Sequence, residues 1–193
     1  MKQMVLLGDT ICLGYRDELR RWLADRAYVF GTPEPITHSA DLLRNLGDWV
    51  LAGQPDLVHF NCGLNDLALP PGRSRPTIPL DRYRSNLEQI IHRIRGESGA
   101  QIVFATSTPI HEERYSAGAN LEFERRNADV LEYNRVAGAV CQDLGVAVND
   151  LYATLADADL DRLMAADGLH LNTAGYQLLA EQVATFLTPY CDR

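Results

Sequence analysis

The sequence predicts an α/β fold: a three-layer α/β/α sandwich built around a parallel sheet of five strands. Two observations predict it. Short, mostly apolar runs of four or five residues recur along the chain, and longer amphipathic segments separate them. Strands that alternate with helices of this length form parallel sheets with helices on both faces. At 193 residues the chain is expected to form one domain, spanning positions 1–193.

The expected strands share a continuous apolar character, without the alternation that marks a strand with one solvent-facing side. Such runs are typical of strands that are buried on both faces of a sheet. In chain order, the expected strands are Gln3–Leu7, Ala27–Phe30, Leu57–Asn61, Ile102–Thr106 and Val146–Asn149.

The expected helices lie between these runs. The three with the clearest apolar stripe, repeating at i, i+4 and i+7, are Asp81–Glu97, Asn127–Leu144 and Thr173–Leu187. Two further segments, Arg16–Arg26 and Ala40–Leu51, show a weaker stripe but have helical length. The two long connections are expected as loops, Leu67–Leu80 and Pro109–Arg126, and loops of that length are often functional.

Composition narrows the class of protein. Hydrophobic residues make up 46% of the chain and charged residues 23%, and the formal net charge is −8. Phosphate-backbone binding needs a positive surface, so nucleic acid is not an expected partner. The four cysteines show no C-x-x-C spacing, and the chain shows neither a signal peptide nor a membrane span. We therefore expect a cytoplasmic protein that does not bind membranes.

Polar residues suited to catalysis follow the expected strands. Thr10 comes directly after the first strand, Asn65 follows the third, and Asp167 and His170 precede the last helix. Each one alone is more often a turn or cap residue. Ligands of parallel sheets bind outside the carboxyl ends of the strands, so these residues are expected to meet in one crevice.

At these positions the chain resembles the SGNH, or GDSL-type, hydrolases. Three of that family's sequence blocks have counterparts here in the same order: Gly8-Asp9-Thr10, Gly63-Leu64-Asn65-Asp66 and Asp167-Gly168-Leu169-His170. The resemblance extends from the first strand to the last helix. It implies a flavodoxin-like sandwich and hydrolysis of ester bonds through a covalent intermediate, without a cofactor.

The resemblance also implies roles for individual residues. Thr10 stands where the family has its serine nucleophile, so its hydroxyl would attack the ester carbonyl. His170 would take the proton from that hydroxyl and return it to the leaving alcohol. Asp167 would orient the imidazole through its other ring nitrogen. The threonine methyl group restricts χ1 and crowds the path of attack.

The donors expected to bind the oxyanion come from the first three blocks, beginning with the backbone N–H of Thr10. By the same resemblance, Asn65 would donate its side-chain amide, and Gly63 would belong to the same oxyanion- and substrate-binding group. The family's second block has a glycine whose backbone N–H serves this purpose, but the matching segment here, "EPITHSADLL", has none. We place its equivalent at Thr37 or His38, because any residue except proline offers a backbone N–H.

The remaining acids of the blocks and the thiols have other expected roles. Asp9 would bind the backbone of the turn around Thr10, and Asp66 would support Asn65. Two alternatives stay open. A catalytically silent domain could bind a carbohydrate, an acyl group or a protein partner in the same crevice. A thiol nucleophile would have to be Cys12 or Cys62, and neither occupies the family position.

No metal site is expected, because the histidines show neither H-x-H nor H-E-x-x-H spacing. His59, inside a strand, is interpreted as a core residue with satisfied hydrogen bonds, and His111 as a solvated loop residue. The expected partner is a small-molecule ester. Tyr115, Phe123 and several charged residues on the long loops favour a small polar or acetylated substrate over a long acyl chain.

Overall fold

A parallel sheet lies at the centre of the molecule. The computed structural model describes residues 1–118 and 122–192. The five strands pair in the order β2-β1-β3-β4-β5, and every pair is parallel. Their bounds are β1 Lys2–Leu7, β2 Ala27–Phe30, β3 Leu57–Phe60, β4 Gln101–Ala105 and β5 Ala147–Asn149. The predicted α/β fold with a five-stranded parallel sheet is confirmed.

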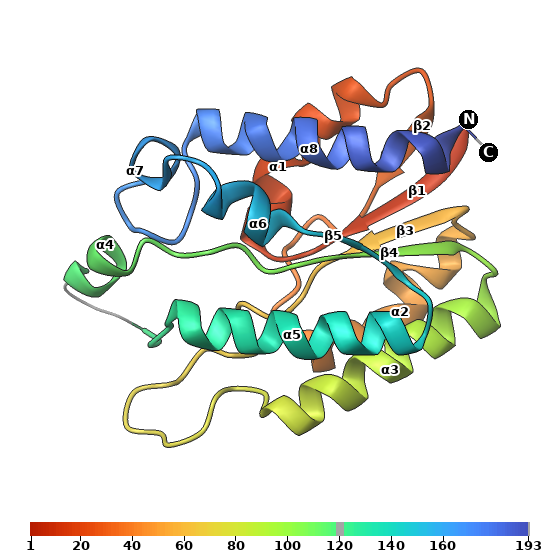
Figure 1. Ribbon diagram of the computed structural model, residues 1–193. Helices are drawn as coiled ribbons and strands as arrows, with labels where there is room; N and C mark the ends of the chain where they lie inside the picture. Colours follow the sequence, from red (N-terminus) through yellow and green to blue (C-terminus); the bar gives the residue numbers. More distant parts are fainter. Residues whose placement is uncertain (119–121, 193) are drawn as a thin grey trace.

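Helices cover both faces of this sheet. On one face α1 packs against α8, with α6 and α7 beside α8, and on the other lie α2, α3 and α5 (Figure 1). The helices are α1 Thr10–Trp22, α2 Ser39–Trp49, α3 Leu80–Glu97, α4 Glu112–Ala117, α5 Asn127–Asp143, α6 Leu151–Ala156, α7 Leu160–Leu163 and α8 Thr173–Cys191, with a 3-10 turn, η1, at Leu51–Gly53.

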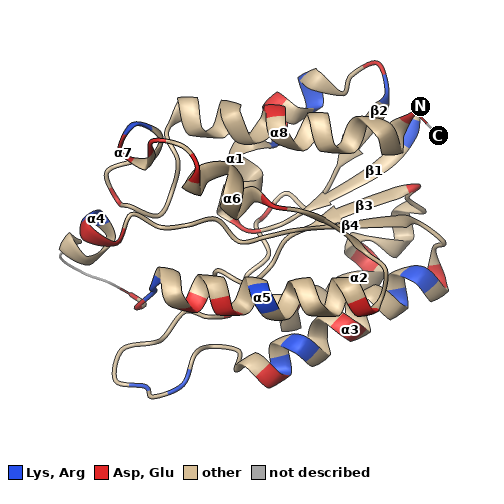
Figure 2. Ribbon diagram, in the orientation of Figure 1, with Lys and Arg blue, Asp and Glu red and all other residues tan. Residues whose placement is uncertain are grey.

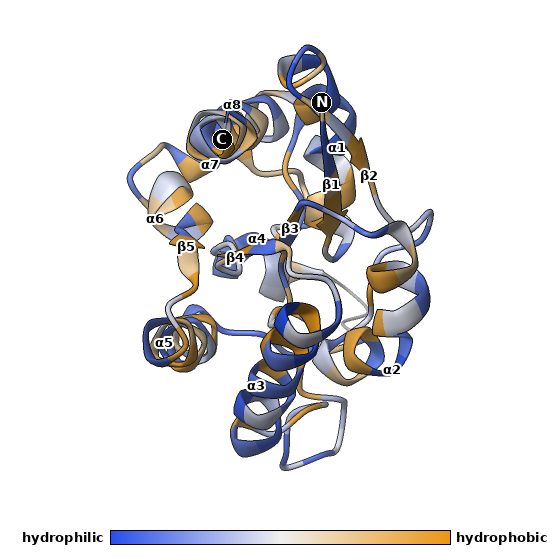
Figure 3. Cartoon of the chain, turned by 90° about the vertical axis from the view of Figure 1, so that its right-hand side faces the viewer, coloured by the Kyte–Doolittle hydropathy of each residue, from blue (hydrophilic) through white to orange (hydrophobic). Residues whose placement is uncertain are grey.

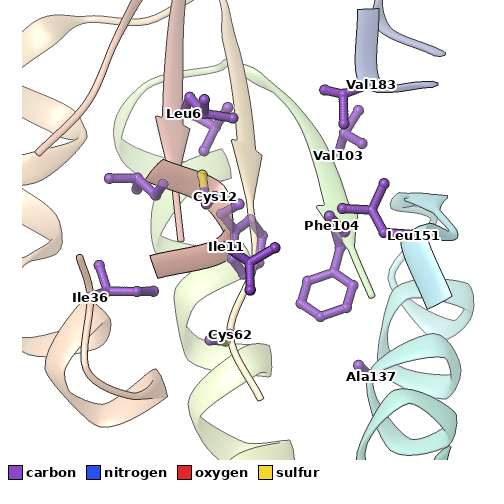
Figure 4. Packing of buried hydrophobic residues seen from close by; sticks show 14 of the residues in the cluster. Leu6, Ile11, Cys12, Ile36, Cys62, Val103, Phe104, Ala137, Leu151 and Val183 are labelled. Atoms are coloured by element: carbon purple, nitrogen blue, oxygen red, sulfur yellow. The ribbon is translucent and has the colours of Figure 1, made fainter. Parts of the chain in front are cut away.

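The core follows from the alternation of side chains along buried strands. Val103 and Phe104 are neighbours on β4, and both are fully buried. Val103 points toward Val183 of α8, whereas Phe104 points toward Ala137 of α5 (Figure 4). Successive residues of a strand face opposite sides, so a sheet covered on both faces must be apolar at every position.

Charge and hydropathy follow the same layering. Charged residues lie on the helices, the loops and the strand ends, while the middle of the sheet carries none (Figure 2). Viewed after a quarter turn, the helices each carry hydrophobic and hydrophilic residues along one element (Figure 3). This amphipathic pattern is the one that predicted the helices from the sequence.

Helices α1 and α8 approach each other closely at one point. A Cβ atom added at Gly14 of α1 would come within 2.2 Å of the ring of Tyr176 on α8. Only glycine has room at this position, so α1 and α8 lie closer together than larger side chains would allow. Gly14 lies about one helical turn after Thr10.

Some of the predicted bounds were wrong. The first helix begins at Thr10, six residues before the predicted start at Arg16, because Asp9 caps it. The second runs from Ser39 to Trp49, and four of the five strands differ from their predicted bounds by one residue at one or both ends. The predicted loop at positions 109–126 contains α4, and positions 119–121 within it lie outside the described residues. The short helices α6 and α7 were not predicted.

His59 corrects a second expectation. It is fully buried in β3, but neither ring nitrogen has a hydrogen-bond partner among the residues that the structure describes. Burial disfavours the charged imidazolium and lowers the pKa of His59 to about 3. The interpretation of a satisfied core residue was therefore wrong, because the ring is neutral and unpartnered in the middle of the sheet.

Candidate active site

Thr10 is presented by a tight turn at the end of β1. Asp9 is the N-cap of α1, and its Oδ1 accepts hydrogen bonds from the backbone N–H groups of Ile11 at 3.0 Å and Cys12 at 3.4 Å. A Cβ at Gly8 would lie 2.4 Å from the Cβ of Cys12, so the turn needs glycine there. Thr10 is thus the first residue of the helix, and its side chain is exposed.

Two side chains from the far end of the sequence meet Thr10. Its Oγ1 lies 2.9 Å from Nε2 of His170, although 160 residues separate them. Nδ1 of the same imidazole lies 2.7 Å from Oδ2 of Asp167. An ionised carboxylate can only accept, so Nδ1 carries the proton and Nε2 is left to accept from the Thr10 hydroxyl. The three side chains form one hydrogen-bonded chain.

Hydrogen bonds keep the Asp167 carboxyl group in its charged form. Burial alone would raise its pKa, but hydrogen bonds from the His170 side chain and from the backbone N–H groups of His170 and Leu169 outweigh that effect. The pKa of Asp167 therefore lies below its usual value. The carboxylate stays ionised at neutral pH and can stabilise an imidazolium at His170.

The loop that carries these residues depends on Gly168. Its φ is +71°, and an added Cβ would lie 2.5 Å from the backbone nitrogen of Tyr115 and 2.7 Å from the carbonyl oxygen of His111. The His111 N–H also donates to the Gly168 carbonyl at 2.8 Å. The loop between Asp167 and His170 therefore packs directly against α4.

His111 has a defined place in this packing. Its Nδ1 accepts from the Arg114 N–H at the start of α4, and its Nε2 lies 2.9 Å from Oδ1 of Asp161. The His111 side chain is only 17% exposed, so the interpretation of a solvated loop residue was wrong. The Arg114 guanidinium contacts the same carboxylate at 2.9 Å. Together these contacts fasten α4 to the α7 region.

The turn after β3 places Asn65. Gly63 has a φ of +143°, and a Cβ there would lie 2.5 Å from Oγ of Ser107, so glycine is required. Asn65 is half-buried, and its Oδ1 accepts a hydrogen bond from Nη2 of Arg125 at 2.9 Å. Asp66 is fully buried and accepts from both the backbone N–H and the hydroxyl of Ser39.

The Asp66 contact connects the turn to the other helix layer. Ser39, which begins α2, also accepts from Nδ2 of Asn86 on α3 at 2.9 Å. Burial raises the pKa of Asp66, while the hydrogen bonds from Ser39 lower it and limit that rise. Asp66 thus fastens the turn to α2 and does not line the pocket at Thr10.

The Thr37–His38 segment lies beside the turn, but neither residue lines the pocket at Thr10. The Ile36 N–H donates to the Gly8 carbonyl at 2.9 Å, which brings the segment alongside the start of α1. The Thr37 hydroxyl and the His38 ring both contact Asp41 within the first turn of α2. A backbone donor from this segment, like a role for Gly63 beyond the turn, stays a prediction.

A pocket of about 720 Å³ opens above the hydrogen-bonded chain. Thr10, Asn65, Asp167 and His170 line it together with residues of α4 and of the segment that leads into α5, among them Arg114, Tyr115, Phe123 and Arg125. Tyr115 and Phe123 are the aromatic residues that the sequence associated with the substrate. Nothing in the sequence indicated the contact between Arg125 and Asn65, because 60 residues separate them.

The thiols do not fit the role of nucleophile. Cys12 and Cys62 are both buried. Burial raises the pKa of Cys12 to about 12 and that of Cys62 well above its usual value. A buried thiol with a raised pKa is not ionised at neutral pH and is unreactive.

A metal centre and a membrane-spanning helix are both absent from residues 1–118 and 122–192. Within these ranges, no group of three or more histidine, cysteine, aspartate or glutamate side chains is arranged to hold a metal ion. None of the helices described there is both long enough and apolar enough to cross a membrane.

Comparison with curated proteins gives relatives of one kind. "GDSL esterase/lipase CPRD49" of Arabidopsis thaliana is 30% identical over 138 residues, which cover 68% of this chain and 54% of that protein. The human "Isoamyl acetate-hydrolyzing esterase 1 homolog" is 29% identical over 130 residues, covering 65% of this chain and 52% of that protein. The chain thus spans about half the length of the curated relatives it matches.

Solved structures agree with the fold. A lipase/acylhydrolase from Enterococcus faecalis is 27% identical and superposes with a TM-score of 0.81, over 98% of this chain and 96% of that one. The acetyl xylan esterase AlAXEase superposes with a TM-score of 0.79, over 96% and 99% of the two chains, at 18% identity. Residues 7–178 match the model of the GDSL-like Lipase/Acylhydrolase family. This match spans the Thr10, Asn65 and His170 blocks, and the chain belongs to the GDSL-like lipase/acylhydrolase family.

Proposed function

We propose that this protein hydrolyses small polar or acetylated esters, with Thr10 as the nucleophile. The observation that carries the proposal is the hydrogen-bonded chain from Thr10 through His170 to Asp167, at 2.9 and 2.7 Å, at the base of an open pocket. A nucleophile within hydrogen-bond reach of a base, which a third group orients, is the arrangement that acyl transfer needs.

The reaction would proceed in two halves. Thr10 Oγ1 attacks the ester carbonyl carbon while His170 Nε2 takes the hydroxyl proton, and a tetrahedral oxyanion forms. The C–O bond to the alcohol then breaks, the alcohol leaves with that proton, and an acyl-threonine remains. A water molecule attacks this ester, again giving its proton to His170. Collapse returns the proton to Thr10 and releases the carboxylic acid.

The oxyanion would be bound by donors at the same edge of the sheet. Asn65 lines the pocket, and its side-chain Nδ2 is a donor of the right kind. The Thr10 amide belongs to the first turn of α1, where backbone N–H groups lack helical acceptors. Asp9 takes the next two N–H groups, which leaves that of Thr10 for the substrate. A third donor would come from the backbone at Thr37 or His38.

The pocket supports the substrate class. Tyr115 and Phe123 give it aromatic sides, and Arg114 and Arg125 bring charge to the same wall. A pocket of this size and polarity suits an acetyl group with a polar alcohol portion. The Arabidopsis and human relatives are named as esterases, which supports ester hydrolysis as the reaction.

A second function is favoured by Thr10 itself. Its additional methyl group restricts χ1 and crowds the carbonyl carbon that must approach Oγ1. If that crowding excluded attack, the pocket would only bind a carbohydrate, an acyl group or a protein partner. The hydrogen bond from Thr10 to His170 argues against this reading, because the rotamer that reaches the base is the one adopted.

The experiment compares the parent protein with Thr10→Ala on p-nitrophenyl acetate and p-nitrophenyl octanoate. We expect the parent to hydrolyse acetate faster than octanoate and the alanine variant to hydrolyse neither. If the parent is inactive on every short ester tested, the binding function replaces the hydrolytic one. If the alanine variant retains full activity, Thr10 is not the nucleophile. A preference for octanoate would contradict the substrate class.

A further inference from the structure

We propose that Arg125 is a positioning residue that orients the Asn65 side-chain amide toward the oxyanion. This inference rests on the proposed ester hydrolysis and assigns a function to a residue outside the family blocks. Arg125 lies just before α5, and its Nη2 donates to Oδ1 of Asn65 at 2.9 Å. It also lines the pocket with Asn65.

The guanidinium contacts the Asn65 turn twice. Nε of Arg125 donates to the backbone carbonyl of Leu64 at 2.9 Å, while Nη2 donates to the Asn65 side chain. The planar fork of an arginine presents these donors in a fixed geometry, which a lysine ammonium does not. Arg125 therefore fixes the side-chain amide relative to the backbone that carries it.

The direction of the Asn65 amide follows from the chemistry of its partner. Arginine has five N–H donors and no acceptor, so the amide atom that faces Arg125 must be oxygen. The amide nitrogen then points away from Arg125 and is free to donate. Without this partner, the final torsion of an asparagine side chain is broad and nearly two-fold. The amide would then also present its oxygen to the oxyanion, which repels it.

Arg125 is itself held in place. Its Nη1 donates to the Tyr115 hydroxyl at 2.6 Å, and that hydroxyl donates to the Phe123 carbonyl at 2.7 Å. The guanidinium carbon lies 5.9 Å from the centre of the Tyr115 ring and 5.4 Å from that of Phe123. These aromatic contacts keep the guanidinium at one place on the pocket wall.

The charge of Arg125 is not used in an ion pair. Within residues 1–118 and 122–192, no carboxylate lies within salt-bridge distance of it. Arg114, on the same wall, contacts Asp161 at 2.9 Å, and Arg126 lies 3.7 Å from Glu124. The three hydrogen bonds of the Arg125 guanidinium thus all go to neutral acceptors, two of them in the Asn65 turn.

A different role could explain the same contacts, because Arg125 also joins α4 to the segment before α5 through Tyr115. The two roles predict different variants to be impaired. If Arg125 only fastens the rim, Tyr115→Phe, which removes the Nη1 acceptor and leaves the Asn65 contact, should be as damaging as Arg125→Met. If Arg125 acts through Asn65, the Arg125 variant should be the more damaging by far.

The experiment measures kcat and KM on p-nitrophenyl acetate for the parent, Arg125→Met, Arg125→Lys and Tyr115→Phe. Arg126→Met is the matched control, because it is the neighbouring arginine and is exposed. We expect Arg125→Met to lower kcat about 10²-fold, as the loss of one oxyanion donor does, with KM changed less than about threefold. Arg125→Lys should recover little of this loss, and Arg126→Met should match the parent.

A double-mutant cycle with Asn65→Ala decides whether Arg125 acts through Asn65. In the Asn65→Ala background, Arg125→Met should cost less than about threefold, because the group that it positions is already gone. Multiplicative losses would overturn the inference, as would a loss confined to KM or an equal loss in Tyr115→Phe. Melting temperatures identify variants that unfold, and Arg125→Lys then carries the test. A parent inactive on all esters would instead refute the proposed hydrolysis.

Discussion

Two parts of the pocket are held in place by different kinds of contact. Its floor consists of Thr10, Asp167 and His170, and its rim consists of Arg114, Tyr115, Phe123 and Arg125. On the floor, Asp9 and Asp167 each bind backbone groups two or three residues further along the chain. On the rim, Arg125 reaches across 60 residues to Asn65, and Arg114 reaches across 47 to Asp161. Local contacts fix the turns that carry Thr10 and His170, and long-range contacts fix the residues around them.

This difference teaches where sequence information lies. A carboxylate that caps its own loop can be recognised in a short motif, because the motif contains both partners. A guanidinium that binds a distant turn leaves no local pattern. The floor is therefore the part of the site that the family blocks describe, whereas the contacts of the rim are not visible in a short motif.

The strongest test of the comparison removes a residue of the floor. His170→Ala should lower ester hydrolysis about 10⁴-fold, because Thr10 then has no base. Thr10→Ala together with His170→Ala should be no worse than either alone, since members of one catalytic unit are not additive. The measurement is kcat/KM on p-nitrophenyl acetate. A double variant that is further impaired would show that the two residues act independently.

The second test changes Gly168, where the Asp167–His170 loop contacts α4. Gly168→Ala should lower kcat about 10²-fold, because its Cβ would push α4 and the Asp167–His170 loop apart, and small displacements of reacting groups are costly. The control is Gly99→Ala, at a similar φ of +68° but with nothing within 4 Å of the added Cβ. It carries the backbone strain without the collision, so it should lose stability and keep its activity. Equal losses of activity in both variants would attribute the effect to strain.

The third test sharpens the description of the floor. Thr10→Ser should raise ester hydrolysis about tenfold, which corresponds to about 1.4 kcal/mol of activation free energy. The methyl group that restricts χ1 would be gone, while the contact with His170 would remain. Single-turnover kinetics on p-nitrophenyl acetate separates acylation from later steps. An unchanged acylation rate would show that the methyl group is not what limits attack.

The fourth change, His59→Leu, should leave the rate of ester hydrolysis at neutral pH unaltered and affect only the stability of the protein. Folding lowers the pKa of His59 from 6.5 to about 3, so below pH 6.5 the unfolded chain binds a proton that the folded one does not. The free energy of unfolding should therefore fall as the pH drops from 6.5 toward 3, by up to about 1.4 kcal/mol per pH unit.

Urea unfolding of the parent and of His59→Leu between pH 7 and pH 4 measures this slope. The leucine variant should show a shallower pH dependence, and it should be no less stable at pH 7, because two unpartnered nitrogens are removed from the sheet. His92→Gln, which replaces an exposed histidine of α3, is the control. A slope that His59→Leu leaves unchanged would assign the acid sensitivity to other groups.

Much of the fold could be predicted because burial on both faces leaves a clear mark. Every residue of β3 is buried, and the run Leu57–Phe60 reads as a strand from its apolar residues alone. The start of α1 was missed because two boundary signals disagree. The apolar stripe indicates a start at Arg16, whereas the cap at Asp9 sets the actual start at Thr10. Helices α6 and α7 are four to six residues long, too short to show a period.

For the site, the candidate residues and the binding of the Thr10 turn by Asp9 were predicted, whereas the long-range contacts that support the pocket were not. Thr10, Asn65, Asp167 and His170 stand in recognisable blocks, and the structure brings all four to one pocket. Arg125 could not be found, because an arginine before a helix is common and its partner is set by tertiary structure. The lack of partners for His59 was equally hidden, since a sequence does not say which neighbours a buried ring will have.

The close packing of α1 on α8 at Gly14 and Tyr176 bears on how this pocket could be changed by laboratory evolution. Thr10 begins α1, and His170 lies three residues before α8, so this helix pair sets the distance between Thr10 and His170. A library of variants at the contact between α1 and α8 would alter that distance, and most of its members would lose activity. A library confined to Tyr115, Phe123 and their neighbours on the rim would explore new substrates while the reacting groups stay in register.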